Sequence, residues 1–357
     1  MALFIAGNTP RTPQHEIAEA LKDPGFGRWF TDDMARADWN PEQGWHGFVL
    51  APTGAIPMHP GLAALHYGQE IFEGLKAYRH PDSSVWLFRP RMNAARFARS
   101  ATRMAMPPLP EEVFIDSVVE LVAHNLAWVP EPTGEASMYL RPFMFGSETL
   151  IGVRAANAYT YIVLGMPVMP FYPDPLRLWI TPNYSRSMAG GTGEAKCGGN
   201  YATALIAENQ AHDMGCQQVL WLDSATRSLV EEGGTMNFFA VTADGELLTP
   251  ALNGQILAGV TRDSLLALAP HHDLTPVERE LTLDELLDGI ASGRITETFA
   301  CGTAAVISPV VGLRSPDIEI TVGDGTPGAT TRALREHLTG IQFGTRDDIF
   351  HWMHRVG

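Results

Sequence analysis

The stretch AGGTGEAKCGGNY, at residues 189–201, places a single lysine, Lys196, in a run of glycine and other small residues. This run has neither the 3.6-residue apolar period of an amphipathic helix nor the alternation of a half-buried strand. It therefore predicts a loop that serves a chemical purpose. One reason to place a lysine in such a loop is that its amine condenses with an aldehyde cofactor.

A pyridoxal phosphate site makes further demands: a carboxylate for the ring nitrogen, a donor for the phenolic oxygen and a helix N-terminus for the phosphate. The candidates are Glu231 or Glu232 in LVEEGGTMNFF, Tyr201, the helix start Gly259-Val260-Thr261 in ILAGVTRDSLLALA, and Thr303 in CGTAA. Taken alone, each has a simpler explanation, such as an N-cap role for Thr261. Their joint occurrence favours the cofactor site.

Length, charge and cysteine content narrow the class of protein. A chain of 357 residues predicts two domains, because one hydrophobic core stops growing below that length. The net charge of −15 excludes nucleic acid as a partner, since phosphate binding relies on clustered basic residues. Three cysteines without framework spacing indicate a reducing compartment. With no leader pattern and no long apolar window, we expect a cytoplasmic protein without a membrane partner.

The apolar patterns predict an α+β domain over residues 1–170, a connector over 171–177 and a second domain over 178–357 that carries Lys196. The connector prediction comes from MPVMPFYPDPLR at 166–177, whose four prolines disfavour helix and deny donors to a sheet. The predicted strands are 77–80, 85–88, 138–145, 159–164, 176–180, 218–222, 237–241 and 246–249. The predicted helices are 91–104, 111–129 and 201–214, with others starting near Thr261 and at the capping box of Thr282.

Two glycine patterns resemble nucleotide sites, and neither is convincing. The loop at 190–196 lacks the Gly before and the Ser/Thr after its lysine that a P-loop needs. GDGTPG at 323–328 matches GxGxxG, but too few residues follow it to build a dinucleotide domain, so we predict a tight turn. The paired histidines at 271–272 and at 351 and 354 lack further ligands at zinc spacing, so no metal site is expected.

The sequence resembles the branched-chain amino acid aminotransferases, which are fold-type IV pyridoxal phosphate enzymes. The matching stretches are FGRWFTDDM (26–34), LHYGQEIFEGLKAYR (65–79), FRPRMNAARFARSA (88–101), YLRPF (139–143), GGTGEAKCGGNYA (190–202), EEGGTMNFF (231–239), ILAGVTRDSLL (256–266) and CGTAAVISPV (301–310). They cover nearly the whole chain. The resemblance implies a two-domain α+β fold like that of D-amino acid aminotransferase, with a small mixed domain and a larger β-rich pseudo-barrel domain.

The resemblance also implies roles for individual residues. Lys196 corresponds to the lysine that binds the cofactor aldehyde, Tyr201 to the donor for the phenolic oxygen, and Glu232, rather than Glu231, to the partner of the ring nitrogen. The remaining cofactor contacts are Arg96, Leu257, Gly259, Val260, Thr261 and Thr303. The substrate contacts are Phe26, Tyr67, Tyr139, Arg141, Thr235, Thr303 and Ala304, of which Arg141 resembles the arginine that meets the distal carboxylate of glutamate.

The implied activity is transamination of leucine, isoleucine and valine with 2-oxoglutarate by a homodimer. A D-amino acid aminotransferase or an aminodeoxychorismate lyase of the same fold type is the alternative. Some family members carry a redox CxxC after the phosphate threonine, where this chain has Ala305 and Ser308. Redox control of that kind is therefore not expected.

Overall fold

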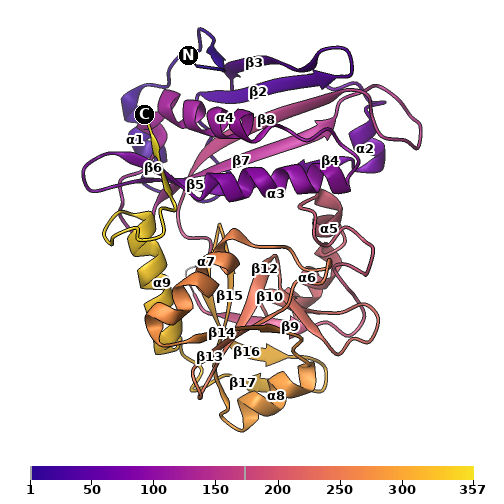
Figure 1. Cartoon of the computed structure of the whole chain (residues 1–357), viewed down its shortest axis with the longest axis vertical. Helices are drawn as coiled ribbons and strands as arrows, with labels where there is room; N and C mark the ends of the chain where they lie inside the picture. The colour runs from indigo at the N-terminus through magenta and orange to yellow at the C-terminus, as the bar shows by residue number, and fades with distance from the viewer. Residues whose placement is uncertain (1, 173) are drawn as a thin grey trace. The chain divides into compact units, whose positions relative to one another are not determined.

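The computed structural model describes residues 2–172 and 174–357, which form two compact units (Figure 1). Unit 1 consists of Met1–Phe171, Ala195–Gly198 and Gly340–Gly357, and unit 2 of Tyr172–Glu194 and Gly199–Thr339. The chain first passes between them at Phe171–Tyr172, within the predicted connector, whose Pro173 lies outside the described residues. The segments 195–198 and 340–357 group with unit 1, whereas the predicted second domain included both.

Unit 1 is built on a nine-stranded sheet with the order β1-β3-β2-β8-β7-β5-β6-β18, with β4 paired to β7. All pairs are antiparallel except β1 with β3. The strands are β1 Ile5–Ala6, β2 Asp33–Asn40, β3 Gly44–Pro52, β4 Glu70–Phe72, β5 Leu75–Arg79, β6 Val85–Phe88, β7 Ser137–Gly146, β8 Tyr159–Val168 and β18 Met353–Val356. The helices are α1 Gln14–Ala20, α2 Ala63–Tyr67, α3 Pro90–Arg103, α4 Glu111–His124 and the 3-10 turn η1 Leu126–Trp128.

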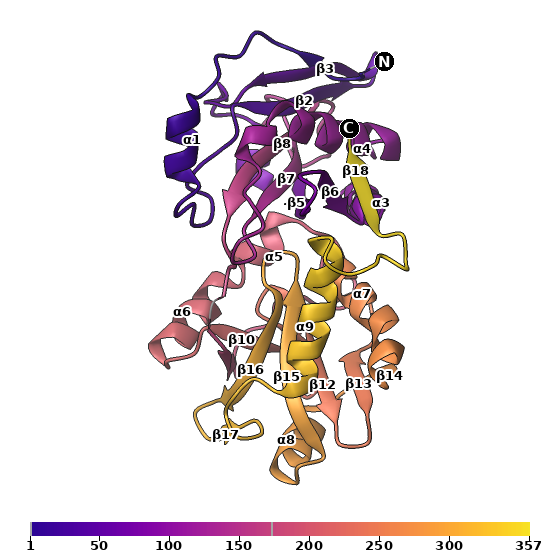
Figure 2. The same cartoon turned by 90° about the vertical axis from the view of Figure 1, so that its left-hand side faces the viewer.

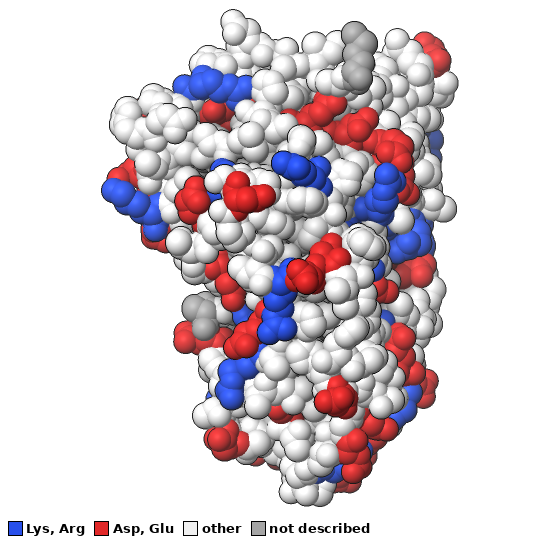
Figure 3. Space-filling view, turned by 60° about the vertical axis from the view of Figure 1, so that its left-hand side comes forward, with Lys and Arg blue, Asp and Glu red and all other residues white. Residues whose placement is uncertain are grey.

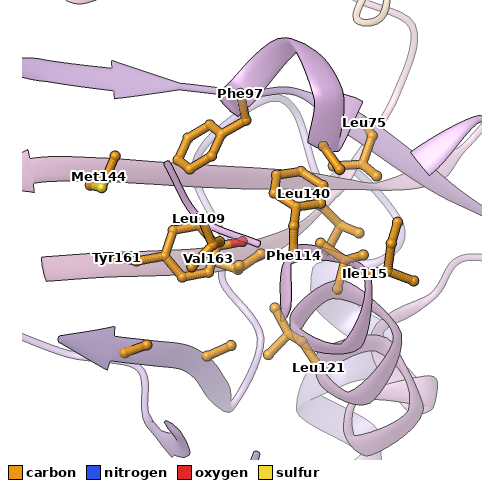
Figure 4. Close-up of a cluster of buried hydrophobic side chains, with 14 of the residues drawn as sticks. Leu75, Phe97, Leu109, Phe114, Ile115, Leu121, Leu140, Met144, Tyr161 and Val163 are labelled. Atoms are coloured by element: carbon orange, nitrogen blue, oxygen red, sulfur yellow. The ribbon is translucent and has the colours of Figure 1, made fainter. Parts of the chain in front are cut away.

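The core of unit 1 lies between the sheet and helices α3 and α4 (Figure 4). Phe97 of α3 and Phe114 of α4 meet with ring centroids 5.6 Å apart, and both rings contact Tyr161 of β8. The Tyr161 hydroxyl lies 2.8 Å from Ser117 Oγ, so the buried phenol keeps a polar partner. Each buried aromatic side chain contributes about 1.5–3 kcal/mol, so this contact fixes α3, which carries Arg96 and Ser100.

The C-terminal segment joins unit 1 through backbone pairing. Strand β18 pairs antiparallel with β6 from Met353–Phe88 to Val356–Val85. The Phe343 ring lies 5.0 Å from that of Tyr78 on β5. These long-range pairings explain why residues 340–357 belong with the N-terminal strands.

Unit 2 contains a second nine-stranded sheet that closes on itself. Its order is β11-β10-β9-β16-β15-β12-β13-β14, and a further β11–β12 pairing joins the ends of the ring β9, β10, β11, β12, β15, β16. Closure leaves the six strands of the ring without free edges. This ring is the β-rich pseudo-barrel that the resemblance predicts. The strands are β9 Leu176–Ile180, β10 Gln218–Leu222, β11 Val230–Gly233, β12 Met236–Thr242, β13 Glu246–Pro250, β14 Thr275–Arg279, β15 Ile295–Gly302, β16 Val306–Arg314 and β17 Glu319–Thr321.

The other elements assigned here are α5 Gly198–Ala202, α6 Leu205–Asp213, α7 Val260–Leu268, η2 Ala269–His272, α8 Leu283–Ala291 and α9 Ala329–Gln342. The predicted capping box is confirmed, because the Thr282 hydroxyl accepts a hydrogen bond from the Glu285 N–H at the start of α8. The strands predicted at 237–241 and 246–249 form a hairpin that turns at Asp244-Gly245, with β12 and β13 antiparallel and Gly245 at φ 83°.

The GxGxxG match is a turn, as predicted. Gly323 and Gly325 have φ values of 56° and 82°, and the Gly325 N–H donates to Val322 O at 3.0 Å. The Glu297 carboxylate of β15 accepts hydrogen bonds from the Thr330 and Thr331 N–H groups, so it caps the N-terminus of α9. Figure 2 shows α9 beside β15. A side chain at Gly328 would collide with that carboxylate. These glycines therefore serve a helix cap.

Three predicted bounds are wrong, each for a local reason. The helix expected over 201–214 is divided into α5 and α6, because the Thr203 hydroxyl donates to the Gly199 carbonyl and competes with the helix. The helix expected over 111–129 ends at His124, where the Asn125 side chain donates to Leu121 O. Strand β8 continues to Val168 through Pro167, which stands opposite Met138.

On the face shown in Figure 3, basic side chains are interspersed with acidic ones. Cys197, Cys216 and Cys301 are all buried and unpaired as disulfides. Among the described helices, none is long and apolar enough to cross a membrane.

Candidate active site

Unit 1 holds the backbone of the segment around Lys196 at three points. The Lys196 N–H donates to Ser100 Oγ of α3 at 3.0 Å, and the Phe72 N–H of β4 donates to Lys196 O at 2.9 Å. Two residues later, the Gly198 N–H donates to the Glu70 carboxylate. The lysine segment is thus fixed by both a helix and a strand of unit 1.

Two glycines of the lysine stretch, Gly193 and Gly198, are explained by the close approach of neighbouring atoms. A Cβ at Gly198 would collide with the Glu70 carboxylate, and within unit 2 a Cβ at Gly193 would collide with the backbone of Gln255. A larger residue at either position would displace the loop. The sequence pattern therefore reflects tight packing around the lysine loop.

The amine of Lys196 is buried among aromatic and charged groups. Its Nζ lies 4.7 Å from the centroid of the Phe72 ring. Burial, and after it the positive charge of Arg96, lower the pKa of Lys196 to about 8, while the charge of Glu73 acts in the opposite direction. Roughly a tenth of the amine is therefore neutral at pH 7, which suits a nucleophile.

Arg96, which the resemblance predicts to contact the cofactor, is buried in an ion pair with Glu73. Its Nε donates to Glu73 Oε1 at 2.6 Å and its Nη2 donates to Oε2 at 2.8 Å. Glu73 lies between β4 and β5 and has no exposed surface. The two parallel hydrogen bonds fix the guanidinium plane.

The predicted substrate residues Phe26, Tyr139 and Arg141 lie together in unit 1. The Phe26 and Tyr139 rings meet edge to face at 5.2 Å, and Arg141 Nη2 donates to the Tyr139 hydroxyl at 3.2 Å. The Arg141 guanidinium also stacks on Phe72, 4.8 Å from the ring centroid, so it shares this aromatic surface with Lys196. A side chain at Gly74 would collide with the Tyr139 hydroxyl.

In unit 2, Glu232 lies at the centre of a buried polar cluster. Its Oε2 is 2.9 Å from Arg186 Nε. Its Oε1 accepts hydrogen bonds from the Leu257 N–H at 3.0 Å and from Asn237 Nδ2 at 3.3 Å. These donors favour the charged carboxylate. The predicted residues Glu232 and Leu257 are thus in direct contact.

The predicted phosphate residues Gly259, Val260 and Thr261 form the N-terminus of α7, which no side chain of the described residues caps. Val260 and Thr261 are buried. A Cβ at Gly259 would collide with Asn237 Oδ1, and Asn237 in turn contacts Glu232. Asn237 therefore links the carboxylate cluster to a helix end that suits an anion.

The other predicted residues lie on turns and short helices. Tyr201 is half-buried in α5, Thr303 and Ala304 are half-buried in the β15–β16 turn, and Thr235 is exposed in the β11–β12 turn. In unit 1, Tyr67 ends α2 with 42% of its surface exposed. Their predicted contacts with cofactor or substrate stay predictions.

Glu231 differs from its neighbour Glu232. Both side chains are buried on β11, but neither carboxylate oxygen of Glu231 has a hydrogen-bond partner within residues 2–172 and 174–357. Burial raises the pKa of Glu231 to about 7; the charge of Arg186 opposes that shift, while the charges of Glu232 and Asp223 add to it. Near neutral pH this carboxyl is therefore partly protonated.

Several residues of the site were missed from the sequence: Phe72, Glu73, Ser100, Arg186 and Asn237. Phe72 and Glu73 stand in FEGLKAYR and Asn237 in GGTMN, two stretches that already carried the resemblance. Ser100 and Arg186 carry no local signal, because their partners lie 96 and 46 residues away in the chain.

Comparison with known proteins identifies relatives over nearly the whole chain. The profile of the family described as amino-transferase class IV matches residues 70–313. The branched-chain-amino-acid aminotransferase of Mycolicibacterium smegmatis is 47% identical over 358 residues, which cover 99% of this chain and 97% of that protein. The branched-chain-amino-acid transaminase 1 of Bacillus subtilis is 42% identical over 332 residues, covering 92% of this chain and 93% of that protein.

Solved structures agree with these relatives. The branched-chain amino acid aminotransferase of T.th. complexed with N-(5'-phosphopyridoxyl)-L-glutamate is 27% identical, with a TM-score of 0.73 over 90% of this chain and 99% of that chain. The branched-chain amino acid aminotransferase of Escherichia coli is 25% identical, with a TM-score of 0.74 over 92% of this chain and 99% of that chain. The expected fold type is confirmed.

Proposed function

Because the chain belongs to the branched-chain amino acid aminotransferase family of the class IV aminotransferases, we propose that it transfers amino groups from branched-chain L-amino acids to 2-oxoglutarate. The donors are leucine, isoleucine and valine, and the products are branched 2-oxo acids and L-glutamate. The 47% identity over 99% of the chain to a branched-chain-amino-acid aminotransferase carries this conclusion. It favours this activity over a D-amino acid aminotransferase or an aminodeoxychorismate lyase.

The cofactor is pyridoxal 5'-phosphate, which when bound supplies an aldehyde and an electron-withdrawing ring. The donor set of the chain fits this group. Lys196 offers an amine of lowered pKa, Glu232 a buried carboxylate held by Arg186, and α7 an N-terminus without a side-chain cap among the described residues. Tyr201 and Thr303 would add hydroxyl donors, and Arg96 a guanidinium.

Lys196 acts first as a nucleophile and then as a proton carrier. Its neutral Nζ is the group that would hold the cofactor through the aldehyde. When an amino acid is bound, the same Nζ would accept the proton from the substrate Cα and carry it within the site. The lowered pKa of Lys196 supports both roles, because each needs the neutral amine.

Glu232 is the partner of the ring nitrogen. Its carboxylate favours a proton on that nitrogen, since an opposite charge nearby stabilises the charged form. Arg186, Asn237 and the Leu257 N–H hold the carboxylate in position. The negative charge of Glu232 is therefore held at a fixed position, where it can stabilise the protonated ring nitrogen.

One pocket has to accept both an aliphatic side chain and the distal carboxylate of glutamate. Phe26 and Tyr139 provide apolar walls, which discriminate by about 1–3 kcal/mol per methylene. Arg141, beside Tyr139, meets the carboxylate of glutamate or 2-oxoglutarate. Tyr67, Thr235 and the Thr303-Ala304 turn complete the substrate contacts.

An assay of stereochemistry tests the activity. With L-leucine and 2-oxoglutarate as substrates we expect amino transfer at least about 100-fold faster than with D-alanine, because the site is built for branched L-amino acids. The measurement is the rate of L-glutamate formation, with visible absorbance as the check that cofactor is bound. A preference for D-alanine would contradict the proposed activity and support a D-amino acid aminotransferase instead.

The enzyme works as a cytoplasmic homodimer. Buried cysteines without disulfides support a reducing compartment. Exposed apolar side chains near α2, among them Leu65 (60% exposed), Ile151 (68%) and Val153 (92%), support association with a second copy. Light scattering should give twice the chain mass of 38.9 kDa, and a single-chain mass at micromolar concentration would contradict the dimer.

A further inference from the structure

Glu73 is a fully buried carboxylate of unit 1 to which the proposed reaction gives no role. It accepts hydrogen bonds from Arg96 Nε at 2.6 Å and Nη2 at 2.8 Å, from Asn93 Nδ2 at 2.7 Å and from the Gly74 N–H at 3.0 Å. Asn93 and Arg96 are themselves buried, with 1% and 5% of their surface exposed. The carboxylate is therefore held by two turns of α3 and by its own backbone.

Glu73 is also electrostatically coupled to the Lys196 amine. Arg96 of α3 and Arg141 of β7 act on the amine with positive charge, whereas Glu73 and the Tyr139 phenol act in the opposite sense. Glu70 of β4 lies near Arg141 and accepts from the Gly198 N–H. Without Glu73, two guanidinium charges would act on one buried amine.

We propose that Glu73 is a positioning residue of the transamination site, which fixes the orientation of Arg96 and balances its charge at the Lys196 amine. Its consequence for catalysis rests on the proposed function, in which Lys196 is the cofactor lysine. The charge balance itself is a property of the chain and can be measured without cofactor.

The direction of the effect follows from the sign of the charges. A nearby charge of like sign lowers the pKa of an amine, and one of opposite sign raises it, by about 1–3 units within 4–6 Å. With Glu73 present, the Lys196 amine is partly neutral near physiological pH, and Arg96 can still serve as a cofactor contact beside it. An uncompensated Arg96 would lower the pKa of Lys196 further and weaken the amine as a base.

The chain is well suited to a direct measurement, because its only lysines are Lys22, Lys76 and Lys196. Protein labelled with lysine carrying 13C at Cε and freed of cofactor should give three resonances, assigned with the variants Lys22→Arg and Lys76→Arg. A pH titration then reports the midpoint of each amine. We expect the parent Lys196 to titrate at about 8.

Four variants test the proposal by the sign of the shift. In Glu73→Gln, which keeps the shape of the side chain, the Lys196 midpoint should fall by about 1 pH unit. In Arg96→Gln it should rise, and in the double variant it should lie between those of the two single variants. Glu73→Asp, which retains the charge, should restore the midpoint to within about half a unit of the parent.

A purely structural role predicts a different outcome. If either substitution only loosened the site, water would enter, the cost of burying the charged amine would fall, and the Lys196 midpoint would rise in both single variants. A rise or no change in Glu73→Gln therefore overturns the proposal. If that variant does not fold, the double variant decides: charge balance places its Lys196 midpoint below that of Arg96→Gln, whereas a midpoint equal to or above that of Arg96→Gln overturns the proposal.

Glu148→Gln is the matched control. It removes an arginine–carboxylate pair of unit 1, Arg154–Glu148 at 2.7 Å, whose arginine side chain is 45% exposed. All three lysine midpoints should stay as in the parent. Borohydride trapping at a residue other than Lys196 would overturn the proposed function but leave these titrations interpretable, so the two proposals fail separately.

Discussion

Replacing Lys196 with alanine should lower the rate of amino transfer from L-leucine to 2-oxoglutarate by about 10⁴-fold. This lies at the upper end for loss of one acid–base group, because the same amine is both nucleophile and proton carrier. The measurement is the rate of L-glutamate formation at saturating substrates and cofactor. The variant should also lose the covalent link to the cofactor, so borohydride should trap no lysine.

Lys22→Ala is the control for this prediction. Lys22 is 70% exposed and pairs with Glu19 at the end of α1, so its removal should leave the rate unchanged within experimental error. With three lysines in the chain, the trapped peptide of the parent can be assigned without ambiguity. An alanine variant at 196 with a rate within about tenfold of the parent would contradict the assigned role.

Replacing Glu232 with glutamine should lower kcat by about 10²–10³-fold, in the range seen when one group that stabilises developing charge is removed. The amide keeps the shape and can still accept from Asn237 and the Leu257 N–H, but it no longer favours a proton on the ring nitrogen. Cofactor affinity should change by less than about tenfold, since the phosphate contacts remain. Single-turnover rates and cofactor titration measure the two effects separately.

Glu231→Gln provides the comparison, because Glu231 is adjacent to Glu232 in sequence and is also buried on β11. Its raised pKa of about 7 leaves the carboxyl partly protonated near neutral pH, and an amide resembles that neutral form. The rate should stay within about threefold of the parent at pH 7. A larger loss of rate in Glu231→Gln than in Glu232→Gln would show that Glu231, and not Glu232, is the partner of the ring nitrogen.

Features with local causes were predictable from the sequence. The strand 176–180 is β9 and the strand 85–88 is β6, because continuous apolar runs bounded by turn residues form buried strands. The cap at Thr282 and the hairpin at Asp244-Gly245 depend on residues within a few positions of each other. The family resemblance added candidate site residues that no local pattern marks, such as Arg96.

Features with distant partners were not predictable in this way. The pairing of β18 with β6 joins residues more than 260 positions apart, and it moves the C-terminal segment into unit 1. The same holds for Ser100, whose hydroxyl holds the Lys196 N–H, and for Arg186, which pairs with Glu232. No periodicity records such contacts, since they form only when separate elements pack.

Motifs and short-range patterns thus predicted the candidate lysine and its cofactor, and the family resemblance predicted the fold type. Packing determined the electrostatic state of that lysine: burial and Arg96 lower its pKa, and Glu73 opposes them. These charges come from α3 and from the connection between β4 and β5, which meet Lys196 only in the folded chain. A titration midpoint depends on desolvation and on distances between charges, and the order of residues along the chain specifies neither until it folds.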